Sequence, residues 1–212
     1  MKVSTLIKSV GLVTIISGAG KLLGFARESI IAAYFGTSEV ADVFFVASLV
    51  PTLLFTAIGT AIQAGIIPLF MEERSKSGER ARDLMSLLGT FLLMVSILFI
   101  GLAILFTEPL IQVMAPGFSP EQTVLAVEIT RIMIPGMVFL TLTAISTGVL
   151  NANKQFVLPA FSATIQNVVI ILATVLLAST YGVYGLSIGV LIGAAGQFLI
   201  QYPSFKKMDI GL

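Results

Sequence analysis

The chain contains no cysteine and no histidine, and only 11% of its 212 residues are charged. Without cysteine it cannot form a disulfide framework, a thiolate metal site or a cysteine nucleophile. Without histidine it lacks the commonest general base and metal ligand. The formal net charge of +1 gives no bulk attraction to nucleic acid. We therefore expect no metal, no cofactor and no nucleic-acid partner.

Hydrophobic residues, in contrast, make up 57% of the chain. A soluble domain is about 25% charged, so a chain this apolar must have lipid as its solvent. The apolar runs are far longer than the roughly 10-residue alternating strands of a membrane barrel, so they predict helices. We expect an all-α membrane protein with one six-helix lobe over residues 1–212. The expected spans are residues 10–35, 41–70, 84–106, 123–150, 157–178 and 183–202.

The basic residues outside these spans all fall on one side of the membrane if six helices cross it. The nine residues are Lys2, Lys8, Arg74, Lys76, Arg80, Arg82, Lys154, Lys206 and Lys207. Basic loops stay in the cytoplasm, so both termini are predicted to be cytoplasmic. A cleaved signal peptide at the N-terminus is the alternative, but the apolar pattern continues past Lys21 to Phe35, which is too long for one.

The connections differ in character. Residues 71–83 carry four basic and four acidic side chains and predict a solvated cytoplasmic loop. Residues 108–122 have no basic residue and contain three prolines, so we expect a broken outer connection. The first two spans exceed the about 20 residues that cross a bilayer, and glycine or proline must bend or tilt such helices. The bend candidates are Gly24, Pro51, Gly59 and Pro135.

Three cations, Lys21, Arg27 and Arg131, lie inside the apolar runs, where a charge is costly and marks a candidate site. Lys21 is roughly 16 Å from the inner end of the first span, near the midplane. An ideal helix separates Lys21 and Arg27 by about 120°, and a bend at Gly24 could turn both toward one cavity.

Two interpretations stay open for the first of these cations. Lys21 could pair with a buried carboxylate, and Glu28 lies seven residues later on nearly the same helix face. Alternatively, Lys21 and Arg27 line a polar cavity that receives an anion, since a fixed cation attracts phosphate strongly in a low dielectric. Arg131 follows Glu128 by three residues, and we expect these two to neutralise each other.

Enzyme signatures are absent from the sequence. It contains no P-loop, no G-x-S-x-G elbow and, without histidine, no H-E-x-x-H motif. No close pair of acidic residues stands out within the spans, as a carboxylate-driven hydrolase would need. The sequence therefore predicts a protein that is not an enzyme.

Four motifs follow one another along the chain. They are Gly24-Phe25-Ala26-Arg27-Glu28 with Phe35-Gly36 and residues 41–47 (ADVFFVA), Ala115-Pro116-Gly117-Phe118, Arg131 with Pro135, and Leu150-Asn151-Ala152-Asn153 with Phe156, Pro159-Ala160 and Asn167. In this order they resemble the motifs of the MurJ/MviN family, which are lipid II flippases of the bacterial cytoplasmic membrane. The resemblance implies the multidrug/oligosaccharidyl-lipid/polysaccharide exporter fold, in which two six-helix lobes face each other across a cavity.

The resemblance also implies a division of roles. This chain would be the N-terminal lobe, with a second lobe supplied in cis or in trans. The substrate would be a polyprenyl pyrophosphate that carries a peptidoglycan precursor, moved by alternating access. Substrate-binding positions of the family correspond to Lys21, where arginine is usual, Arg27 and Asp42. The family's cation site would lie in the other lobe, so no metal is expected here.

The chain departs from the family pattern in the second span. A basic pair usual after P-x-L-L is replaced by Phe55 and Thr56, and a glutamate expected one turn later is lost near Gly59. Ala163 stands where a proline is usual in the fifth span. Two alternatives therefore stay open: an exporter of another polyprenyl-linked saccharide or of a drug, and a non-transporting membrane scaffold for cell-wall enzymes.

Overall fold

The computed structural model of the chain describes residues 3–36 and 38–208, with side chains from residue 11 onward except for several in residues 57–75. Lys2 and the side chains of Lys8 and Arg74 lie outside this description. The described residues are helical and contain no strand. The helices are α1 (Val3–Phe35), α2 (Glu39–Lys76), α3 (Gly78–Leu105), α4 (Thr107–Met114), α5 (Pro120–Met133), α6 (Gly136–Ala152) and α7 (Val157–Lys206).

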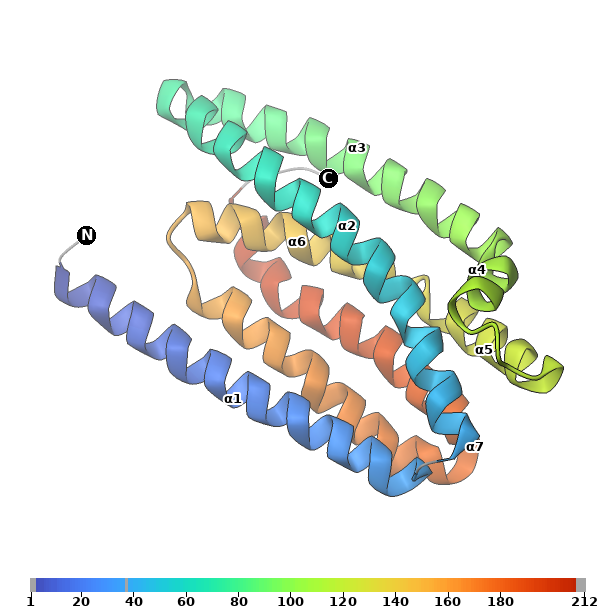
Figure 1. The fold of residues 1–212 in the computed structure, drawn as a ribbon. Helices are drawn as coiled ribbons and strands as arrows, with labels where there is room; N and C mark the ends of the chain where they lie inside the picture. The colour runs from blue at the N-terminus through green and yellow to red at the C-terminus, as the bar shows by residue number, and fades with distance from the viewer. Residues whose placement is uncertain (1–2, 37, 209–212) are drawn as a thin grey trace.

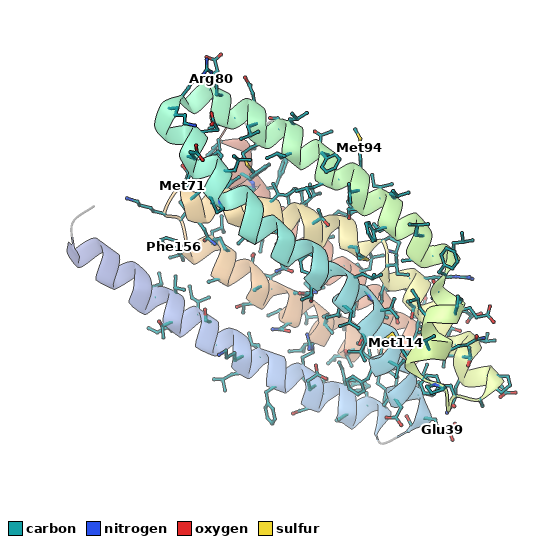
Figure 2. The ribbon with its side chains drawn as sticks, turned by 45° about the horizontal axis from the view of Figure 1, so that its top comes forward. Glu39, Met71, Arg80, Met94, Met114 and Phe156 are labelled. Carbon is teal, nitrogen blue, oxygen red and sulfur yellow. The ribbon has the colours of Figure 1, made fainter. Side chains whose placement is uncertain are left out.

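The helices form an elongated bundle with two chemically different ends (Figure 1). One end carries the start of α1, the α2–α3 turn, the α6–α7 turn and the end of α7. Figure 2 shows Arg80, Met71 and Phe156 toward this end, and Glu39 and Met114 toward the other. We call the first the basic end, because the described Lys and Arg residues of the turns lie there. Its assignment to the cytoplasm stays a prediction.

Helix α7 is a hairpin of two antiparallel halves. Its backbone leaves the helical region at Gly182, where φ is 55° and ψ is −136°, a conformation that favours glycine. The halves then run side by side: Gln201 Nε2 donates to Ser162 Oγ at 2.6 Å, and the backbone of Gly189 lies directly against Ala173. The chain therefore folds back between the expected fifth and sixth spans, residues 157–178 and 183–202. That each half crosses the membrane stays a prediction.

Several helices of the bundle are long and apolar. Among the described residues, three stretches are long and apolar enough to cross a membrane: Glu39–Thr56, Gly78–Leu105 and Val157–Lys206. The pair α5 and α6 qualifies as a fourth if it forms one span bent by 42°. The total of six crossings stays a prediction.

The fourth predicted span is broken in the middle. Helix α5 ends at Met133, and α6 begins at Gly136, after Ile134 and Pro135. Ile134 and Met137 are fully buried, so the break lies in the core rather than at the surface. Whether Pro135 acts as a hinge stays a prediction. In contrast, α2 continues unbroken through both Pro51 and Gly59.

The predicted loop over residues 71–83 is wrong. Helices α2 and α3 extend through it and leave only Ser77 between them, whose Oγ accepts a hydrogen bond from the Arg80 N–H at 3.5 Å. Lys76 donates to Glu72 at 2.8 Å and to Glu73 at 2.9 Å, and its hydrogen bond lowers the pKa of Glu72. Such i, i+3 and i, i+4 pairs support a helix beyond the lipid, which the charge count alone does not reveal.

The broken connection predicted over residues 108–122 is present only between α4 and α5, at residues 115–119 with Pro116 and Gly117, and the rest of the segment is helical. Pro109 lies in the first turn of α4, and Pro120 opens α5, positions where a missing N–H removes no helical hydrogen bond. Ser119 and Gln122 cap α5 reciprocally at 2.8 and 3.2 Å. These prolines therefore start helices instead of breaking the segment.

Three buried clusters hold the described helices together, of which a small one joins Ala103, Ile134 and Met137. The cluster at the basic end joins α2, α3, α6 and α7 through Phe70, Met85, Ile145 and Phe205. The larger cluster, toward the other end, joins α1, α2, α4, α5 and α7 and includes Ile31, Phe44, Ile111, Ile129 and Leu186. Exposed apolar side chains such as Met94, which is 63% exposed, point outward from α3, as a lipid-facing surface requires (Figure 2).

The close contact between the two halves of α7 predicts that two glycine-to-alanine substitutions differ in how much they destabilise the protein. A Cβ at Gly189 would lie 2.3 Å from the Cβ of Ala173, so Gly189→Ala forces the two halves apart. We expect a loss of about 1–3 kcal/mol of stability, measured as thermal unfolding in detergent. The matched control is Gly196→Ala, whose Cβ would lie 3.7 Å from Ile165 Cγ2. An equal loss in both variants would contradict the hairpin packing.

Candidate functional site

Helix α1 is held mainly by α7 and touches α2 only slightly. Two glycines one turn apart make this approach possible. A Cβ at Gly20 would lie 3.0 Å from Thr164 Oγ1, and one at Gly24 would lie 3.7 Å from Asn167 Nδ2. Asn167 also donates to the carbonyl oxygen of Gly20 at 3.2 Å. This is the small-xxx-small packing expected where helices lack a hydrophobic driving force.

Arg27 lies at the centre of this contact. Its Nη1 donates to Asn167 Oδ1 at 2.9 Å, while its Nη2 forms an ion pair with Glu28. The side chains of Arg27 and Glu28 are 29% and 44% exposed, so the pair lies at the edge of the protein surface. The Asn167 amide thus directs its oxygen to the cation and its nitrogen to a backbone carbonyl, which uses both of its polar atoms.

A cavity opens beside this pair, between α1 and α2. It has a volume of about 140 Å³ and continues into a second space of about 70 Å³ that shares Ser48, Thr52, Gln166 and Val190 with it. We call the two together the α1–α2 cleft. Its first part is lined by Arg27, Glu28, Ile31, Phe44, Phe45, Ser48, Thr52, Gln166, Ile170 and Val190.

One side of the cleft carries hydroxyl groups along α2. Ser48 donates to the Phe45 carbonyl at 2.8 Å, and Thr52 donates to the Ser48 carbonyl at 2.7 Å. Because these donors are used within the helix, the oxygen lone pairs are what the hydroxyls offer to a ligand. The cleft therefore combines a guanidinium donor with hydroxyl acceptors and the amide of Gln166, a set that suits an anionic, hydroxylated ligand.

The structure brings one of the three predicted binding residues into the cleft. Arg27 lines it, whereas Lys21 and Asp42 are exposed and do not. Helix α1 runs unbroken through Gly24, and whether it bends there stays a prediction. Glu28 pairs with Arg27 rather than with Lys21.

The predicted ion pair between Glu128 and Arg131 is wrong. In the described part of the chain no ion pair joins them, and Glu128 instead accepts a hydrogen bond from the hydroxyl of Tyr184. Tyr184 lies on the second half of α7. Helical spacing within one span cannot reveal a partner that tertiary packing supplies.

Sequence reasoning noted Asn167 only as part of a motif and missed Gln166, Ser48 and Thr52. One signal was present, because Gln166 and Asn167 are adjacent amides in an otherwise apolar run. Polar side chains at such depth face a cavity or the bundle interior. The hydroxyls of Ser48 and Thr52 gave a weaker signal, since such groups are common in apolar helices.

Comparison with known proteins gives consistent results. The family model described as "Lipid II flippase MurJ" matches residues 31–212. The lipid II flippase MurJ of Burkholderia cenocepacia is 36% identical over 197 residues, which cover 90% of this chain and 38% of that protein. The lipid II flippase MurJ of Thermosipho africanus is 35% identical over 189 residues, with 88% and 39% covered. The chain thus spans less than half the length of these relatives.

Solved structures agree on the fold. A lipid II flippase MurJ in an inward closed conformation superposes with a TM-score of 0.78 at 28% identity, covering 93% of this chain and 47% of that one. A MOP superfamily transporter from Pyrococcus furiosus superposes with a TM-score of 0.68 at 16% identity, covering 97% and 46%. The chain therefore has the fold of one half of such an exporter.

The link between Arg27 and Asn167 predicts the effect of an isosteric change. Asn167→Leu removes the acceptor of Arg27 and the donor to Gly20 and leaves a charged group short of a partner. We expect a loss of about 1.5–3 kcal/mol, measured by thermal unfolding. Gln112→Leu is the control, because its 3.3 Å hydrogen bond to Glu108 is exposed. If the two variants melt alike, Arg27 does not depend on Asn167.

Proposed function

The chain belongs to the MurJ family of lipid II flippases, and on that premise we propose that it forms one wall of a lipid II flippase in the bacterial cytoplasmic membrane. The observation that carries the proposal is Arg27, a cation held by Asn167 at the edge of an open cleft between two membrane helices. Six spans with both termini cytoplasmic place this cleft across the bilayer, and a second lobe supplies the opposite wall.

The size of the cleft supports a two-walled site. At about 140 Å³ with a further 70 Å³, it is smaller than the roughly 300–1,000 Å³ of sites that enclose a ligand. A saccharide with a pyrophosphate cannot fit inside it. One lobe alone therefore offers a contact surface, and alternating access requires two such surfaces that rock against each other.

Arg27 is the group that we assign to the pyrophosphate. A guanidinium binds phosphate oxygens in a bidentate manner, and the apolar helices around the cleft lower the dielectric and strengthen the attraction. Glu28 already shares this charge through its ion pair, so an incoming pyrophosphate has to compete with a carboxylate. Such competition weakens binding and favours release, which a transporter needs on the far side of the membrane.

The other predicted residues take supporting roles in this proposal. Lys21, exposed on α1, adds a second cation once the opposite lobe covers it, and Asp42 gates the site or orients these two cations. Gly24, Pro51, Gly59 and Pro135 remain the candidate bending points. Transport needs no covalent step, so the chain acts as a transporter part and not as an enzyme.

The test is reconstitution with lipid II as cargo. We expect the 212-residue chain alone to leave lipid II on the side where it was loaded, and a second lobe added in trans or fused after Leu212 to restore movement. Arg27→Gln should then lower the rate at least about tenfold, since it removes charge-assisted hydrogen bonds. Arg80→Gln, which removes a charge outside the cleft, should not.

The outcomes separate the competing functions. Movement by the monomeric chain alone would refute the one-wall proposal, and movement by a homodimer would mean that two copies supply both walls. If Arg27→Gln changes nothing, the pyrophosphate site is elsewhere. Transport of another polyprenyl-linked saccharide or of a drug in place of lipid II would favour a different exporter, and no transport with any second lobe would favour a scaffold.

A further inference from the structure

A separate cavity of about 560 Å³ lies at the basic end of the bundle, far larger than the α1–α2 cleft. It lies where three segments meet: the α2–α3 turn, the α6–α7 turn and the end of α7. Its lining is Phe70, Gly78, Ala81, Arg82, Asn153, Gln155, Ser204, Lys207 and Met208. We call it the basic pocket. It shares no residue with the cleft, so it is not part of the site described above.

Among the residues that the structure describes, the lining of the basic pocket contains two cations and no carboxylate. Arg82 comes from α3, and Lys207 follows α7, so segments distant in the sequence each supply one positive charge. Within the described residues Lys207 forms no ion pair. Gln155 and Ser204 add uncharged polar groups. This combination attracts an anion.

The walls of the basic pocket are tied together. The Asn153 amide donates to the Val149 carbonyl at 2.8 Å and to Met208 Sδ at 3.2 Å, which joins the α6–α7 turn to the end of α7. The turn is closed by the Gln155 N–H, which donates to the Leu150 carbonyl at 2.9 Å. The pocket is therefore formed by the fold rather than by loose side chains.

An apolar cavity of about 380 Å³ adjoins the basic pocket, and Gln155 lines both. The rest of its lining is Lys154, Phe156, Val157, Leu158 and Phe161. Lys154 adopts a φ of 63°, which is strained for any residue with a Cβ. This left-handed residue closes the C-terminus of α6, with the Lys154 N–H bonded to the Asn151 carbonyl, and it places a lysine in the lining of the apolar cavity.

We propose that these adjoining cavities bind an anionic phospholipid, with its phosphate in the basic pocket and an acyl chain in the apolar cavity. Only a ligand that is anionic at one end and apolar at the other fills both spaces. The bilayer supplies such a ligand at the depth where this end of the bundle emerges, and basic residues there each strengthen the attraction. A bound lipid bridges the α2–α3 turn and the end of α7 and stabilises the basic end.

The test measures binding to the purified 212-residue chain by native mass spectrometry, with phosphatidylglycerol, phosphatidylcholine and inorganic phosphate as probes. We expect phosphatidylglycerol to bind best. Arg82→Gln with Lys207→Gln should weaken it at least about tenfold, since each cation contributes about a half to one decade. The matched control, Lys76→Gln with Arg80→Gln, removes the same charge at the same end but outside the pocket and should have little effect.

Four results would overturn the proposal. Equal losses in the two double variants would mean a diffuse surface attraction. If inorganic phosphate competes as well as the lipid does, the pocket is a site for free anions. Phe161→Ser should weaken binding of the lipid but not binding of phosphate. Equal binding of phosphatidylcholine would exclude a role for the negative charge. Arg82→Lys with Lys207→Arg keeps both charges and should retain binding, so a loss there would also count against the pocket.

Discussion

A guanidinium group within an apolar bundle must have acceptors, and Arg27 has two of them. Asn167 on α7 accepts from one nitrogen at 2.9 Å, and Glu28 on the same helix pairs with the other. An unpaired cation inside a bilayer is costly, so these partners constrain where α1 can lie. The Asn167 link ties α1 to α7, whereas α1 touches α2 only slightly, and the cleft lies where α1, α2 and α7 meet.

Small residues make this arrangement possible. Gly20 and Gly24 let the Asn167 amide reach the backbone of α1, and Gly189 lets the halves of α7 meet without a gap. Close backbone approach replaces the hydrophobic driving force that helices lack in lipid. Helix α1 thus packs against α7, and the polar lining of α2 faces this pair across the cleft.

Much of the fold was predictable, because long apolar runs and turn residues mark the helices and the fold-back at Gly182. The break before Gly136 was also visible, since proline cannot continue a helical ladder. The ends of the helices were not predictable. Charged residues continue α2 and α3 beyond the apolar runs, and Pro109 and Pro120 lie in the first turns of helices. Local composition does not distinguish a proline that breaks a helix from a proline that begins one.

The site was predictable only in part. Arg27 was identified because any cation at that depth is suspect, but its partner Asn167 is 140 residues away in the sequence. Helical spacing placed Lys21 and Glu28 on nearly the same face, but Glu28 forms its ion pair with the adjacent Arg27. Glu128 similarly accepts a hydrogen bond from the Tyr184 hydroxyl instead of pairing with Arg131. Partners supplied by tertiary packing cannot be obtained from periodicity within one helix.

The central claim is that the α1–α2 cleft is open to water and not filled by lipid. The direct measurement is the reaction rate of single cysteines with a charged thiol reagent, which is clean because the chain has no native cysteine. Ser48→Cys lies in the cleft, and Met94→Cys lies on the outward surface of α3 (Figure 2). The account predicts fast labelling at position 48 and slow labelling at position 94, because only a hydrated thiol ionises and reacts. Equally slow labelling at both positions would contradict it.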